Sequence, residues 1–66
     1  MDYTKGELME AKRQIDSTVH KLRAAVKTLE SKEDSARYKS QITLAKRRVA
    51  AFETASALIE KEIEAK

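Results

Sequence analysis

The 66-residue sequence has no cysteine, proline or tryptophan, and it contains a single glycine and a single histidine. A domain of this size buries only about 60% of the surface that its unfolded chain exposes, so its core is marginal. Small proteins usually compensate with disulfides, a metal ion or oligomerisation. The lack of cysteine excludes disulfides, and one histidine offers no pair for a metal. These absences favour self-association, and we expect no cofactor.

Long apolar runs are also absent. No stretch approaches the roughly 18 residues of a membrane-spanning helix, and residues 1–5 lack the pattern of a signal peptide. We therefore expect a soluble, unprocessed protein that does not associate with membranes. A chain without cysteine is compatible with the reducing cytoplasm, which is the predicted location.

Helix-forming residues are abundant. Charged residues make up 38% of the chain, and the net charge is only +3, so both signs are interspersed as on a solvated helix surface. Alanine, lysine, arginine, glutamate and leucine are common, and all five favour helices. The predicted fold class is all-α, with one domain over residues 1–66.

The first predicted helix covers about residues 5–30. Thr4 and Glu7 mark its start because they fit a capping box, and Asp2 is an alternative cap. Lys12 lies on the apolar face of this helix, where a lysine weakens packing but orients it. The apolar residues of that face recur at helical spacing and are Leu8, Ile15, Val19, Leu22, Val26 and Leu29.

A polar connection at about residues 31–35 precedes a second helix, predicted over about residues 36–64. Of the next five positions in the first apolar pattern, only Ala36 is apolar. A new apolar face begins two positions out of phase and consists of Tyr38, Ile42, Ala45, Val49, Phe52, Ser56, Ile59 and Ile63. This phase break favours an antiparallel hairpin, with Ser31 or Asp34 capping the second helix. The alternative is a parallel coiled coil of continuous helices.

The second helix has another apolar strip beside this face. A helix that is apolar over so wide an arc usually contacts two neighbours, and the chain provides only one. We therefore predict that hairpins self-associate into a four-helix bundle with coiled-coil packing, as a homodimer or a larger oligomer. The predicted oligomer interface consists of Leu44, Ala51, Phe52, Ala55, Leu58 and Ile59.

Basic residues cluster in the first half of the second helix, and acidic residues follow in its second half. Such a gradient can orient an antiparallel dimer, or its basic end can contact an acidic protein or the phosphates of nucleic acid. Few aromatic residues and no recognisable DNA-binding motif make nucleic acid the weaker hypothesis. The candidate phosphate contacts are Arg37, Lys39, Lys46, Arg47 and Arg48.

No group of residues indicates an active site. His20 has one acidic neighbour at helical spacing, Asp16, which is typical of an exposed helix. Glu60 and Glu64 share a face, but two carboxylates are a poor start for a divalent-cation site. We predict a non-enzymatic interaction or assembly module that binds itself or another protein, with no catalytic, cofactor-binding or metal residues. The alternative is a small accessory nucleic-acid-binding protein.

Overall fold

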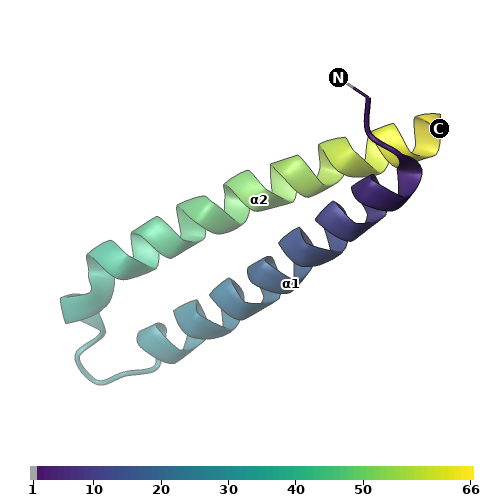
Figure 1. Ribbon diagram of the computed structural model, residues 1–66. Coiled ribbons are helices and arrows are strands. Elements are labelled where there is room, and N and C mark those ends of the chain that lie inside the picture. Colours follow the sequence, from purple (N-terminus) through teal and green to yellow (C-terminus); the bar gives the residue numbers. More distant parts are fainter. Residues whose placement is uncertain (1) are drawn as a thin grey trace.

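The computed structural model describes residues 2–66 and consists of two long helices joined by a short turn (Figure 1). Helix α1 covers Lys5–Glu30, the 3₁₀ segment η1 covers Ser35–Tyr38, and helix α2 covers Lys39–Ala65. The helices lie side by side in opposite directions, so the start of α1 is next to the end of α2. This confirms the predicted all-helical hairpin. Met1, which begins the predicted domain, lies outside the described residues.

The dimensions of the molecule distinguish a hairpin from a continuous helix. Its principal extents are 48 × 15 × 15 Å. One helix of the same length would extend to roughly 100 Å at about 1.5 Å per residue. The chain therefore folds back on itself, and the phase break in the apolar pattern marks the place.

Helix α1 begins with the predicted capping box. The Thr4 hydroxyl accepts a hydrogen bond from the Glu7 backbone N–H at 3.1 Å, and the Glu7 carboxylate accepts one from the Thr4 N–H at 3.0 Å. Two donors that would otherwise be unpaired at the helix start are thus satisfied. The hydrogen bond from the Thr4 backbone is the main cause of a lowered pKa of Glu7, since it stabilises the carboxylate.

The turn differs from the prediction. Ser31 ends α1 instead of capping the second helix, and its hydroxyl donates to the carbonyl of Thr28 at 2.8 Å. Asp34 precedes η1, but its side chain makes no capping hydrogen bond. The backbone enters the second helix through a tight 3₁₀ turn, and α2 starts at Lys39 rather than at residue 36. The Lys32 ammonium lies 5.6 Å from the centre of the Tyr38 ring across this turn, a cation–π contact.

The two predicted apolar faces meet along the length of the hairpin. Leu8, Val19 and Val26 of α1 are each 8% exposed, and Ser56 of α2 is 7% exposed. The other residues of both faces are half-buried. Within residues 2–66 no side chain is fully enclosed. The core is one layer of contacts between two helices, and it is open on both of its sides.

Candidate interaction surfaces

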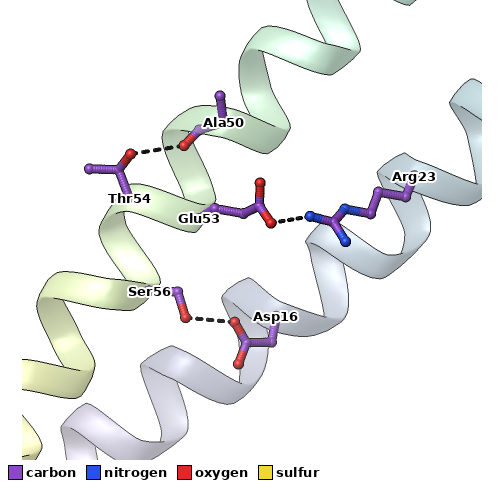
Figure 2. Close-up of polar contacts among 6 residues, drawn as sticks. All are labelled: Asp16, Arg23, Ala50, Glu53, Thr54 and Ser56. Atoms are coloured by element: carbon purple, nitrogen blue, oxygen red, sulfur yellow. Dashed lines mark hydrogen bonds and ion pairs between the residues drawn. The ribbon is translucent and has the colours of Figure 1, made fainter.

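Two ion pairs connect the helices. The Arg23 guanidinium of α1 pairs with the Glu53 carboxylate of α2, and the Lys46 ammonium of α2 lies 2.9 Å from the Glu30 carboxylate of α1 (Figure 2 shows the first pair). All four side chains are about half exposed to solvent. Exposed pairs of this kind add little stability, typically below about 1 kcal/mol each, but they favour one alignment of the helices.

A polar cluster lies farther along the same flank. The Ser56 hydroxyl donates to one carboxylate oxygen of Asp16 at 2.7 Å, and the Lys12 ammonium donates to the other at 2.8 Å. The hydrogen bond from Lys12, followed by that from Ser56, lowers the pKa of Asp16, because both stabilise the carboxylate. The hydrogen bond to Asp16 raises the pKa of Lys12 in turn. Asp16 accepts hydrogen bonds from both Lys12 and Ser56. These two polar side chains are thereby tolerated in otherwise apolar helix faces.

We call this flank of the hairpin, which carries the cluster and the two ion pairs, the polar side. A groove of about 570 Å³ lies along it, and His20 and Glu60 line the groove together with the paired residues. Asp16, the acidic neighbour expected for His20, is bound to Lys12 and Ser56. In the described part of the chain, no three His, Cys, Asp or Glu side chains are arranged to hold a metal ion.

On the opposite flank, α2 carries mainly apolar and small side chains, and we call this flank the apolar side. Leu44 and Leu58 of α2 are 47% and 62% exposed, and Ala51 and Ala55 lie between them at helical spacing. Residues at this spacing form one strip along a helix, here roughly a quarter turn away from the contact with α1. The exposure of both leucines means that α1 does not cover this strip.

Two hollows on the apolar side reach the helix–helix contact. Ile15 and Phe52 line one of about 120 Å³, and Leu8 and Ile59 line another of about 320 Å³. Phe52 and Ile59 were predicted in the oligomer interface as well as in the contact between the helices. Both are half-buried against α1, and both keep an accessible edge on the apolar side.

The five basic residues proposed as phosphate contacts do not share one surface. Lys46 pairs with an acid of α1, and Arg37 lies 3.9 Å from an acid of the turn. Lys39 and Lys46 line a hollow on the polar side. Arg48 lies on the apolar side, because residues 44, 48, 51, 55 and 58 follow one helical strip. Arg47 is exposed and points about 100° around the helix from Arg48. The cluster that is compact in the sequence is thus divided between η1, which carries Arg37, and different sides of α2.

The faces that meet were predictable from the periodicity of the sequence, but the ion pairs between the helices were not. Both pairs are centred on Tyr38, the last residue of η1: Arg23 and Glu53 lie 15 residues before and after it, and Glu30 and Lys46 lie 8 residues before and after it. The predicted connection at about residues 31–35 is centred about five residues earlier. Counting outward from the predicted turn would therefore not have matched these opposite charges.

Comparison of the chain with protein-family models, with curated proteins and with solved structures gave no match. Neither of the two helices in residues 2–66 has the length and apolar character needed to cross a membrane.

Proposed function

We propose that this chain is a non-enzymatic helical assembly module that acts as a homo-oligomer, in which hairpins pair into a four-helix bundle. The supporting observation is the incomplete burial of the single hairpin. Its accessible surface is 5303 Å², whereas a compact monomer of 7.5 kDa exposes about 4250 Å² by the usual size scaling. The excess, about 1050 Å², is comparable to the roughly 800 Å² that each partner buries in a standard protein–protein interface.

The nature of the exposed surface supports the same proposal. Leu44, Leu58 and the accessible edge of Phe52 lie on the apolar side, where water contacts them in the single hairpin. Removing apolar surface from water stabilises an assembly by about 25 cal/mol per Å². A bundle of two hairpins would cover these side chains and close one open side of each core.

Accessory nucleic-acid binding is the second candidate. Within residues 2–66, Lys39, Arg47 and Arg48 have no ion-pair partner, so their charges are available to phosphates. Their distribution around α2 gives the hypothesis less support than a single basic face would. Titration with a fluorescent oligonucleotide at low and moderate salt tests it, because phosphate contacts weaken steeply as salt rises. No binding at low salt would exclude this function.

The molar mass in solution tests the assembly proposal directly. Light scattering over a range of concentrations should give a mass of at least two chains of 7.5 kDa. Small-angle scattering on the same sample should give a longest dimension close to the 48 Å of one hairpin, since paired hairpins of equal length add thickness but little length. A folded monomer at every concentration would refute the proposal. A particle near 100 Å would instead contradict the hairpin.

A further inference from the structure

We infer that the second copy of the chain docks on the apolar side, with α2 against α2 in antiparallel orientation and the two-fold axis between Ala51 and Ala55. This inference rests on the proposed self-association and specifies its surface and orientation. The contact involves one strip along α2, called the docking strip, which consists of Leu44, Arg48, Ala51, Ala55, Leu58 and Glu62.

The distribution of charge selects the apolar side rather than the polar side. On the polar side, Arg23 with Glu53 and Glu30 with Lys46 are hydrated ion pairs, about half exposed. Covering them with another molecule would remove their water, and that cost commonly exceeds the attraction within a pair. The docking strip has only two charged residues, Arg48 and Glu62, one toward each end. Burial of the docking strip therefore costs far less desolvation free energy than burial of the polar side.

The spacing of the docking strip fits a helix of the same sequence. Its members alternate at intervals of four and three residues, the pattern that lets two helices pack side by side. Ala51 and Ala55 at the centre allow the two backbones to approach closely. In the antiparallel register, residues at equal distances from the axis face each other, so Ala51 faces Ala55 of the second copy. Leu58 in this register covers the aliphatic stem of Arg48 from the second copy.

Charge complementarity selects the antiparallel orientation. In that register Arg48 lies about one helical turn from Glu62 of the second copy, and symmetry forms this contact twice. In a parallel dimer Arg48 would instead face Arg48, and Glu62 would face Glu62. The whole of α2 shows the same gradient: its charged residues before Val49 are all basic, and those after it are acidic except for Lys61. Such gradients determine orientation more than they determine affinity.

Charge reversal tests the orientation. Arg48→Glu and Glu62→Arg are made singly and together, and the dissociation constant of the dimer is measured by sedimentation at low salt. Each single variant places like charges across both symmetric contacts and should raise the Kd about tenfold. The double variant restores opposite charges and should return the Kd to within about twofold. The matched control, Lys39→Glu with Glu64→Arg, has the same charge changes outside the strip and should leave the Kd unchanged.

A cysteine substitution gives an independent readout, since the chain has no cysteine of its own. The antiparallel register places residue 44 of the two copies about 27 Å apart, far beyond the roughly 7 Å that a disulfide spans between Cα atoms. Leu44→Cys, oxidised at a chain concentration at which sedimentation shows it to be dimeric, should therefore not cross-link within the dimer. Efficient cross-linking, or a dimer whose affinity the double charge reversal fails to restore, would overturn the inferred orientation and leave self-association standing. A monomeric wild-type chain would refute the proposed function itself.

Discussion

Truncation of Leu58 to alanine is the most direct test of the docking strip. Full burial of a leucine side chain contributes about 1.5–3 kcal/mol, and 62% of Leu58 is still exposed in the hairpin. Burial of that remainder is worth roughly 1–2 kcal/mol per chain, and a two-fold dimer buries it twice. The loss of roughly 2–4 kcal/mol should raise the Kd of the dimer about 30- to 700-fold.

The assay is a dilution series of Leu58→Ala followed by sedimentation or light scattering. The hairpin itself should change little, since substitutions at exposed positions usually alter stability by less than about 0.5 kcal/mol. Alanine also favours helix more than leucine does. If dissociation and unfolding are coupled, the variant should show a lower melting temperature that falls further on dilution.

Met9→Ala is the matched control. Met9 is 55% exposed, close to Leu58, but it lies seven residues before Asp16 and therefore on the flank of α1 that forms the polar side. Its truncation should leave the dimer unchanged. Equal weakening by both variants, or an unchanged dimer with Leu58→Ala, would show that the docking strip is not the interface.

Three further predictions concern the stability of the hairpin. Phe52→Asp places a carboxylate between the helices and should dissociate and unfold the chain together, as seen by circular dichroism and light scattering. Ser17→Asp on the exposed face should do neither. A folded monomeric Phe52→Asp would contradict this prediction. Thr4→Ala removes the side-chain cap and should lower the free energy of unfolding in urea by about 1 kcal/mol, with Thr4→Ser close to wild type; equal losses in both would argue against capping. Folding lowers the pKa of Asp16 below its ordinary value of 3.8. The contribution of Asp16 to folding stability is therefore complete above pH 3.8 and is lost as the pH falls through the lowered pKa. The melting temperature should therefore fall less between about pH 5 and pH 2 in Asp16→Asn than in wild type, and an undiminished fall would refute this role.

The positions that pack between the helices were predictable from the sequence because the pattern that specifies them is local. Residues at intervals of three and four must share a helix face, so the predicted faces of both helices are buried or half-buried, including the polar Ser56. The capping box at Thr4 is equally local, since its two hydrogen bonds span three residues.

The start of the second helix was not predictable in the same way. Ser31 and Asp34 both have side chains that can cap a helix. The Ser31 hydroxyl, however, donates to a carbonyl of the first helix, and the Asp34 side chain makes no capping hydrogen bond. Whether either side chain caps the second helix depends on the path that the chain takes to bring α2 against α1. The 3₁₀ turn at Ser35–Tyr38 is a result of that path.

The sequence by itself thus determined two helices, the face that each buries, and the approximate place of the turn. Only the tertiary structure decided which flank of α1 meets which flank of α2. Two amphipathic helices can pack with the second on either side of the first, and the periodicity of their apolar faces is the same in both cases. In the hairpin observed here, Asp16 and Arg23 meet Ser56 and Glu53 on one side. The strip from Leu44 to Leu58 is consequently left uncovered on the other, because a hairpin of two helices has no third element to bury it.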